Sequence, residues 1–164
     1  MKTSILRLVV CGTDTDVGKT IVSALLVQGL GATYWKPVQS GLNEGTDTKR
    51  VCQLLNLPST RCLPEAYKFA AAVSPHWAAE KELKWIDLEN LSVPKVTGPL
   101  VVEAAGGLMV PLNRQSLQID QIKQWDLPVV LVARSGLGTI NHTLLSIEAL
   151  RLRKIPILGI VLNG

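Results

Sequence analysis

Residues 12–20, with the sequence GTDTDVGKT, are the first group whose types and spacing could do chemistry. Glycines and small side chains let backbone N–H groups turn inward around phosphate oxygens, and a following helix adds the positive end of its dipole. A lysine after the last glycine can reach the β- and γ-phosphates of a nucleotide, and the next hydroxyl can bind Mg²⁺. Lys19 and Thr20 occupy these two positions. The segment therefore predicts a nucleotide phosphate site.

This loop departs from the common phosphate-binding pattern in two ways. Five residues, rather than four, separate Gly12 from Gly18. Asp14 and Asp16 also place carboxylates where an anion is expected, so they either point away from the phosphates or meet a cationic substrate or a metal. The hydroxyl of Thr15 could contact whatever accepts the γ-phosphate. A strand-to-helix turn can contain Gly-Lys-Thr by chance, but here strand, glycines, Lys-Thr and helix follow in the required order.

The elements that must position this loop follow from the apolar pattern. Short runs rich in Val, Ile and Leu, typical of strands buried on both faces of a parallel sheet, occur at 6–11, 33–36, 100–103, 129–133 and 158–162. Longer amphipathic stretches predict helices at 19–30, 47–55, 75–83, 117–124 and 141–151, the last with its leucines on one stripe. Ser74 before Pro75 is a typical helix start. The alternation predicts an α/β fold of the P-loop NTPase-like kind, with a mostly parallel sheet flanked by helices on both faces.

Composition excludes several classes of protein. The chain has 164 residues, of which 47% are hydrophobic and 18% charged, which excludes a disordered tail, a collagen-like repeat and a coiled coil. We expect a single domain over residues 1–164. The net charge of +4 comes from scattered residues, and aromatic residues are few, so we expect no nucleic-acid partner. No apolar run approaches the ~20 residues of a membrane helix, so we expect no membrane.

The cysteines and histidines carry no recognisable site. Cys11, Cys52 and Cys62 are odd in number and form no CxxC pair, so we expect reduced thiols in a reducing compartment, and hence a soluble cytoplasmic protein. His76 and His142 lack partners at metal-ligand spacing and are interpreted as structural.

Beginning at the phosphate loop, the sequence resembles the dethiobiotin synthetase family. The matching segments follow in order: GTDTDVGKT at 12–20, YWKPVQSG at 34–41, SPH at 74–76, EAAGGLMVPL at 103–112, LPVVLVA at 127–133 and LGTINH at 137–142. The resemblance covers nearly the whole chain. The loop together with KPVQSG and the Glu-Gly-Gly segment makes it strongly specific.

The resemblance implies an ATP-dependent ligase of biotin biosynthesis. Members of the family close a cyclic urea on 7,8-diaminononanoate (7,8-diaminopelargonate) with CO₂, giving dethiobiotin, ADP and phosphate. The implied path runs through a carbamate, which attacks the γ-phosphate, and a carbamic–phosphoric anhydride, which the second amine attacks. Two lysines and a divalent metal would stabilise the negative charge that converges there. Mg²⁺ as cofactor, ATP as co-substrate and a homodimer are implied with it.

The resemblance also implies roles for individual residues. Lys36 and Lys19 would be the catalytic lysines. The ATP site would comprise Asp16, Val17, Gly18, Lys19, Thr20, Ile21, Asp47, Glu103, Ala104, Ala105, Gly106, Asn163 and Gly164, and Mg²⁺ would be held by Thr20, Asp47 and Glu103. The substrate would be bound by Thr15, Ser40, Leu137, Gly138, Thr139 and Asn141, the last four holding its carboxylate tail across the dimer interface.

Several of these residues have a second interpretation. Lys36 could be an ordinary surface lysine before Pro37. Asp47 could only favour the dipole at a helix start, with Glu44 nearby. Asn141 could simply cap the following helix. Glu103 is harder to explain otherwise, because a carboxylate at a strand end usually points into the ligand crevice of an α/β sheet.

The chain also departs from the family pattern in two places. The family has glycine where this chain has Ala104, which would cost about 1 kcal/mol or more if that position required a positive φ. The family also continues beyond Asn163 with further adenine contacts, so we expect the sequence to lack a C-terminal segment.

Two rival functions remain open from the sequence. A partition-type or cell-division-type ATPase, which switches between protein partners, shares this fold, but its signature lysine is replaced by Asp14. A glutamine-dependent amidoligase would need an additional domain for which the chain has no room. Neither rival explains KPVQSG.

Overall fold

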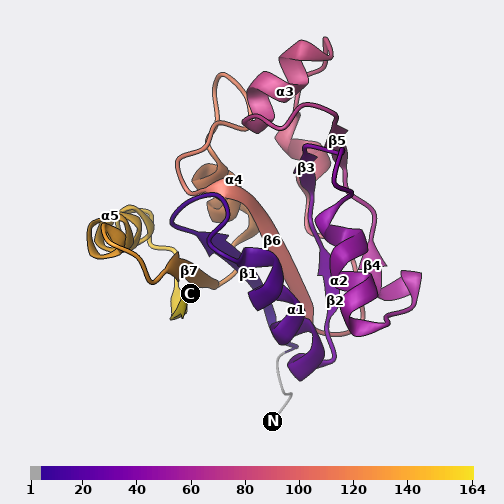
Figure 1. The fold of residues 1–164 in the computed structure, drawn as a ribbon, viewed down its shortest axis with the longest axis horizontal. Helices are drawn as coiled ribbons and strands as arrows, with labels where there is room; N and C mark the ends of the chain where they lie inside the picture. The colour runs from indigo at the N-terminus through magenta and orange to yellow at the C-terminus, as the bar shows by residue number, and fades with distance from the viewer. Residues whose placement is uncertain (1–4) are drawn as a thin grey trace.

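The computed structural model describes residues 5–164 and gives each expected strand a counterpart. The strands are β1 (Arg7–Gly12), β2 (Thr33–Trp35), β3 (Val38–Ser40), β4 (Cys62–Leu63), β5 (Tyr67–Phe69), β6 (Leu100–Gly107), β7 (Val129–Arg134) and β8 (Ile157–Asn163). The α-helices are α1 (Lys19–Leu30), α2 (Asp47–Leu55), α3 (Pro75–Lys81), α4 (Gln118–Trp125) and α5 (Thr139–Leu152), and two 3₁₀ helices are η1 (Ser59–Arg61) and η2 (Leu88–Leu91). Figure 1 shows the phosphate loop between β1 and α1.

The main sheet has the strand order β4-β2-β6-β1-β7-β8, and its strand pairs are parallel. Adjacent residues of a strand point to opposite faces, and both faces carry a hydrophobic cluster. Leu8 and Val10 pack with α1 and α2 on one face, whereas Val9 and Cys11 pack with α4 and α5 on the other. This confirms the predicted α/β fold with helices on both faces of a parallel sheet.

The smaller strands lie in segments where the sequence predicted no regular structure. β3 and β5 form a separate parallel pair, with Val38 opposite Tyr67 and Ser40 opposite Phe69. β4 pairs with β2 at the edge of the main sheet. These strands have only two or three residues, too few to show an alternating pattern, and prolines surround them.

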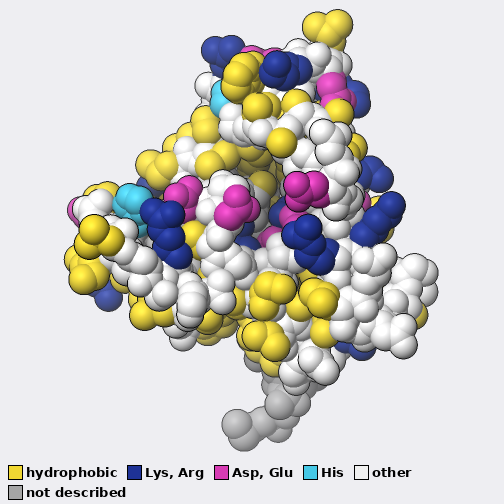
Figure 2. All heavy atoms as spheres, viewed as in Figure 1, with side chains coloured by type: hydrophobic (Ala, Val, Ile, Leu, Met, Phe, Trp, Pro, Cys, Tyr) yellow, Lys and Arg dark blue, Asp and Glu magenta, His cyan; other side chains and the backbone are white. Residues whose placement is uncertain are grey.

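The C-terminal part of the sheet is less buried than the sequence predicted. In α5 the leucine stripe faces outward, with Leu144 60% and Leu145 57% exposed. In β8, which forms the edge of the sheet, Leu158, Ile160 and Leu162 are also exposed. The expectation that β8 is buried on both faces is therefore wrong, and the apolar stripe predicted for α5 is largely exposed. An edge strand has a neighbour on one side only. Hydrophobic side chains are correspondingly visible over α5 in Figure 2.

The expectation of three reduced thiols is wrong for two of them. A disulfide joins Cys52 in α2 to Cys62 in β4, while Cys11 is a buried free thiol. The sequence reasoning missed the pair because the two cysteines become neighbours only when α2 packs beside the sheet edge. The cysteines therefore no longer support the inference of a reducing compartment. Among the described residues no helix is both long and apolar enough to cross a membrane.

Candidate active site

The phosphate loop follows the carboxyl end of β1 and leads into α1. Gly18 is the N-cap of α1 and has a φ of 94°, a conformation that favours glycine. A Cβ at Gly12 would lie 2.9 Å from the carbonyl oxygen of Asp14, so the loop also requires glycine there. Within residues 5–164, the backbone N–H groups of residues 16–20 have no hydrogen-bond partner. Free amides at a helix N-terminus form a site for an anion.

Lys19 extends along this loop and is 6% exposed. Its Nζ donates a hydrogen bond to the carbonyl oxygen of Asp14 at 2.8 Å. Burial lowers the pKa of Lys19 below its ordinary value, and the positive charge of Lys36 lowers this pKa further. The ammonium is therefore poorly compensated, and a bound phosphate would supply the missing negative charge.

The centre of the site is Glu103, which is fully buried in β6. Its Oε1 accepts hydrogen bonds from the Thr20 hydroxyl at 2.9 Å and from Lys36 Nζ at 3.0 Å. Its Oε2 accepts a hydrogen bond from the Tyr34 hydroxyl at 2.9 Å. The carboxylate thus connects α1, β2 and the residue that follows β2.

Asp47 is the second carboxylate and begins α2, as predicted. Its Oδ2 forms a short ion pair with Lys36, and its Oδ1 lies 3.7 Å from Arg50. Its backbone N–H donates to Gln39 Oε1 at 3.0 Å, while the neighbouring Thr46 caps the helix. Burial by itself would raise the pKa of Asp47, but the charge and hydrogen bond of Lys36, together with Thr20 and Arg50, outweigh burial and lower this pKa. Asp47 therefore does more than favour a helix dipole.

Lys36 lies between these two carboxylates and is 6% exposed, so its interpretation as a surface lysine is wrong. Burial would lower the pKa of Lys36, but Glu103 and Asp47 more than offset burial and raise it. Lys36 is consequently held as an ammonium. It can act as a fixed positive charge but not as a base.

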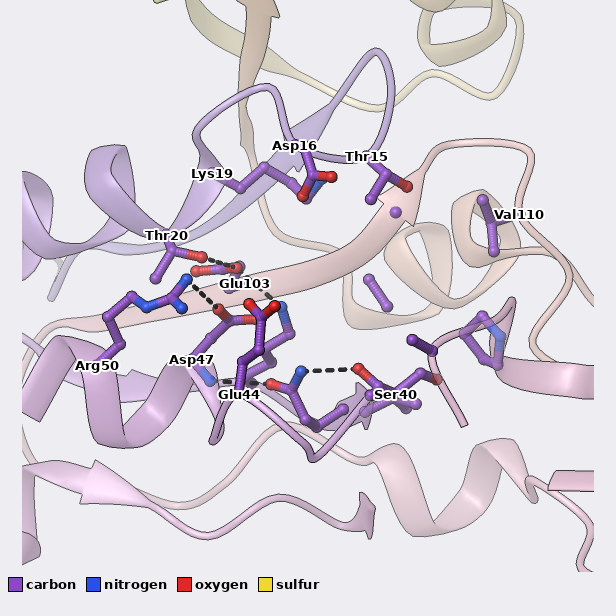
Figure 3. Close-up of a pocket in the computed structure, with 18 of the residues that line it drawn as sticks. Thr15, Asp16, Lys19, Thr20, Ser40, Glu44, Asp47, Arg50, Glu103 and Val110 are labelled. Atoms are coloured by element: carbon purple, nitrogen blue, oxygen red, sulfur yellow. Dashed lines mark hydrogen bonds and ion pairs between the residues drawn. The ribbon is translucent and has the colours of Figure 1, made fainter. Parts of the chain in front are cut away.

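These groups face a cavity of about 790 Å³. In Figure 3 the phosphate loop and α1 form one side of the cavity, with Ser40 and Glu44 on the opposite side. Charged side chains of both signs gather in the middle of the face shown in Figure 2. The Ser40 hydroxyl is buried and has no hydrogen-bond partner among the described residues, which leaves it free to bind a ligand.

The cavity brings together most of the residues predicted from the sequence, but not all. It is lined by Thr15, Asp16, Gly18, Lys19, Thr20, Ile21, Lys36, Ser40, Asp47, Glu103, Ala105 and Gly106. Of the two loop carboxylates, Asp16 lines the cavity, while Asp14 accepts the backbone N–H of Thr15. Val17, Ala104 and Gly164 are not part of the lining.

The predicted substrate-tail residues lie at the N-terminus of α5, outside the lining of this cavity. Leu137, Gly138 and Asn141 are exposed, and Thr139 is partly buried. α5 begins at Thr139 with Gly138 as its N-cap. Asn141 therefore lies inside the helix, and its interpretation as a cap is wrong.

Asn163 lies beside the phosphate loop, although it is outside the cavity lining. Its Nδ2 donates to the carbonyl oxygen of Val17 at 3.2 Å. A Cβ at Gly18 would collide with the Asn163 amide, which gives a second reason for glycine at this position. The end of β8 thus comes next to the start of α1.

Ala104 is accommodated without backbone strain. It is fully buried in β6 and is not among the residues with positive φ, whereas Gly106 has a φ of 61°. The cost considered for alanine at position 104 does not arise.

Sequence reasoning assigned no individual role to several residues of the site: Tyr34, Gln39, Glu44, Arg50 and Val110. Arg50 adds a third cation beside the two predicted lysines. Tyr34 and Gln39 lie in the segment YWKPVQSG, so their proximity to Lys36 was the available signal. Arg50 lies one helical turn after Asp47, on the same face of α2.

Thr20, Asp47 and Glu103 form a donor set suited to Mg²⁺. Mg²⁺ prefers oxygen ligands and is usually held by one or two carboxylates together with substrate phosphates. Among residues 5–164 no group of three or more His, Cys, Asp or Glu side chains could hold a metal. The two carboxylates and the hydroxyl fit a metal that is shared with a nucleotide, rather than one held by protein alone.

Comparison with known proteins gives consistent matches. A family model described as an AAA domain matches residues 6–164. The ATP-dependent dethiobiotin synthetase BioD of Rhodopseudomonas palustris (strain BisB18) is 57% identical over 158 residues, covering 96% of this chain and 76% of that protein. The enzyme of the same name from Paramagnetospirillum magneticum is 55% identical over 155 residues, covering 94% of this chain and 75% of that protein.

A solved structure is similar in fold alone. The kinase domain of the Escherichia coli tyrosine kinase ETK matches with a TM-score of 0.51 and 18% sequence identity. The match covers 100% of this chain and 69% of that chain. At this identity the likeness supports the α/β fold alone and says nothing of the function.

Proposed function

The chain belongs to the dethiobiotin synthetase family, and we propose that it closes the cyclic urea of dethiobiotin on 7,8-diaminononanoate with CO₂ and ATP. The observation that carries the proposal is the buried cluster of Lys36, Asp47 and Glu103 facing the phosphate loop across one cavity. A protein-switching ATPase and an amidoligase are not favoured, because the relatives at 55–59% identity are ATP-dependent dethiobiotin synthetases.

The first part of the reaction brings two anions together. One substrate amine adds to CO₂ and loses a proton to give a carbamate, whose oxygen attacks the γ-phosphorus while ADP leaves. The free loop amides and Lys19 would bind the phosphates. The ammonium of Lys36, held protonated by its carboxylate neighbours, would offset the repulsion between carbamate and γ-phosphate.

The second part closes the ring. The other substrate amine attacks the carbonyl carbon of the carbamic–phosphoric anhydride, phosphate leaves with its bonding electron pair, and the amine proton is lost. The chain contributes orientation here, and positioning can supply roughly 7–11 kcal/mol of a barrier. Thr15 and Ser40, on the lining of the same cavity, would orient the diamine.

Mg²⁺ would be held by Thr20, Asp47 and Glu103, and when bound it would neutralise charge on the ATP phosphates. These three side chains already lie close together: the Thr20 hydroxyl donates to Glu103, and Lys36 donates to both Glu103 and Asp47. Asn163, beside the loop, would contact the adenine, and residues 103–106 and Gly164 would complete the ATP site.

We also propose a homodimer in which residues at the start of α5 bind the substrate's carboxylate tail. Leu137, Gly138 and Asn141 are exposed outside the cavity of their own chain, so a second copy would have to bring them to a substrate. The exposed apolar side chains of α5 are consistent with such a contact. Sedimentation of the protein should therefore give a dimer.

The test is direct synthesis. Incubation of the protein with ATP, Mg²⁺, bicarbonate and 7,8-diaminononanoate should give dethiobiotin by mass spectrometry and one phosphate per ring formed. Lys36→Met should lose product formation by roughly 10²-fold or more while still binding ADP. Lys123→Met, at an exposed position of α4, should behave as the wild type. ATP hydrolysis independent of the diamine, with no cyclic urea, would contradict the proposal.

A further inference from the structure

Tyr34 is a tyrosine whose hydroxyl is buried next to the reaction site. The residue lies in the middle of β2 and is 0% exposed. Buried tyrosine hydroxyls normally require a hydrogen-bond partner. Here the partner is Oε2 of Glu103, at 2.9 Å. The neighbouring buried aromatic residue of β2, Trp35, donates instead to the carbonyl oxygen of Pro64, away from the site.

The hydrogen bonds of Glu103 are divided between its two oxygens. Oε2 is bound by Tyr34, and Oε1 is bound by both Thr20 and Lys36. A carboxylate anchored at one oxygen cannot rotate about its terminal bond without losing that hydrogen bond. The other oxygen is consequently held toward the phosphate loop, where Thr20 begins α1.

We propose that Tyr34 is a positioning residue that fixes the orientation of the Glu103 carboxylate, so that Oε1 is presented to the metal-bearing end of the nucleotide site. The inference rests on the proposed function, because it assigns Glu103 to the Mg²⁺ site. Tyr34 itself touches neither substrate nor metal. It acts through Glu103.

The ring of Tyr34 is held firmly enough to serve this purpose. It belongs to the hydrophobic cluster under α1 and α2, which includes Val27 and Val51, both fully buried. Register adds a second constraint, because Tyr34 pairs with Val101, two residues before Glu103 on the same face of β6. The hydroxyl is therefore placed by packing and by strand pairing together.

The test uses Tyr34→Phe, which removes only the hydroxyl, and Tyr67→Phe as the matched control. The Tyr67 hydroxyl also takes part in hydrogen bonds, accepting from the Asp87 backbone and from Asn90, but it lies outside the cavity. The principal measurement is the Kd of Mn²⁺ for the protein–ADP complex, followed by electron paramagnetic resonance. Loss of a hydrogen bond that orients a metal ligand typically costs 10–100-fold in metal affinity or activity.

We expect the Kd of Mn²⁺ to rise at least tenfold in Tyr34→Phe and less than twofold in Tyr67→Phe. ADP binding in the presence of EDTA should not change in either variant. The Mg²⁺ concentration for half-maximal dethiobiotin formation should rise with the Mn²⁺ Kd, with kcat largely recovered at saturating Mg²⁺.

The outcomes separate the two proposals. An unchanged Mn²⁺ Kd in Tyr34→Phe, or an equal loss of metal and metal-free ADP affinity, would overturn the positioning role. Should the wild type form no dethiobiotin while Tyr34→Phe still loses Mn²⁺ affinity, the proposed function fails and the positioning role stands. Thermal unfolding in EDTA identifies a variant that has merely lost its fold. In that case the Tyr34→Phe substitution is added to Glu103→Gln, which removes the buried carboxylate that Tyr34 hydrogen-bonds. Because Tyr34 acts through Glu103, the double variant should bind Mn²⁺ as Glu103→Gln does, and a further rise in the Kd of Mn²⁺ would overturn the positioning role.

Discussion

Replacing Lys36 by methionine should destabilise the protein as well as inactivate it. The ammonium of Lys36 is the cation between two carboxylates, at 3.0 Å from Glu103 and in a short ion pair with Asp47. Methionine keeps the hydrophobic stem but leaves Glu103, which is fully buried, without its counter-charge. Removing one partner of a buried ion pair typically costs roughly 3–5 kcal/mol.

The structure places the expected cost at the lower end of this range. Glu103 retains hydrogen bonds from Thr20 and Tyr34, and Asp47 is partly exposed beside Arg50. We therefore expect the free energy of unfolding to fall by about 3 kcal/mol. For a domain of this size that corresponds to a decrease in Tm of roughly 6–12 °C.

The assay is urea unfolding at pH 7 in EDTA, followed by circular dichroism. Lys123→Met is the control and should stay within about 0.5 kcal/mol of the wild type, because Lys123 is exposed. Adding Glu103→Gln to Lys36→Met should restore part of the lost stability, since the buried charge is then removed. An unfolding free energy of Lys36→Met within 1 kcal/mol of the wild type, as an order-of-magnitude threshold, would refute the reasoning. So would a double variant less stable than Lys36→Met.

Three further predictions follow from other contacts. Folding lowers the pKa of Lys19, so its charge costs stability at neutral pH. Lys19→Met should therefore raise the unfolding free energy by roughly 0.5–2 kcal/mol at pH 7. This gain should disappear as the pH rises to the ordinary lysine pKa, and the variant should no longer be stabilised by ATP. Urea unfolding at several pH values, with and without ATP, measures both effects. Reducing the Cys52–Cys62 disulfide, whose sequence separation is 10, should lower the unfolding free energy by about 2–3 kcal/mol. Dithiothreitol should therefore lower the Tm of the wild type but leave the Tm of Cys52→Ser unchanged. Gln39→Leu should cost about 1 kcal/mol in urea unfolding and weaken ADP binding, because Gln39 accepts the first N–H of α2 at Asp47; unchanged values would exclude this role.

The sequence predicted the principal elements because their patterns are long enough to be distinctive. The expected ranges 19–30 and 47–55 coincide with α1 and α2. The β3–β5 pair escaped because three-residue strands give no periodic signal. The exposure of α5 and β8 could not be predicted for another reason. An apolar stripe in a sequence does not reveal which surface will cover it.

For the site, the sequence could predict residue types near the loop but not the contacts between distant segments. Lys19 and Thr20 follow from a local motif. That Lys36 bridges Asp47 and Glu103 depends on where α2 begins and on which strands are neighbours. The disulfide escaped in the same way, because Cys52 lies in a helix and its partner lies at the sheet edge.

One part of the site does follow once the strand order is known. Side chains alternate along a strand, so Tyr34 and Lys36, which are two residues apart, point to the same face of the sheet. Pairing of Tyr34 with Val101 and of Trp35 with Val102 then brings Lys36 beside Glu103. Parallel register between β2 and β6 is thus sufficient to bring the ammonium next to the carboxylate.

The same argument explains why this register has to be secure although β2 has only three residues. A shift of one residue would turn Trp35 toward the phosphate loop and Lys36 toward the opposite core. Tyr34 is 0% exposed in the cluster under α1 and α2, whereas Trp35 is 4% exposed in the cluster under α4. Neither side chain can exchange faces without leaving its hydrogen bond, to Glu103 for Tyr34 and to the Pro64 carbonyl for Trp35. The two aromatic residues before Lys36 therefore hold the strand in register from both sides, and the position of the lysine at the site follows from them.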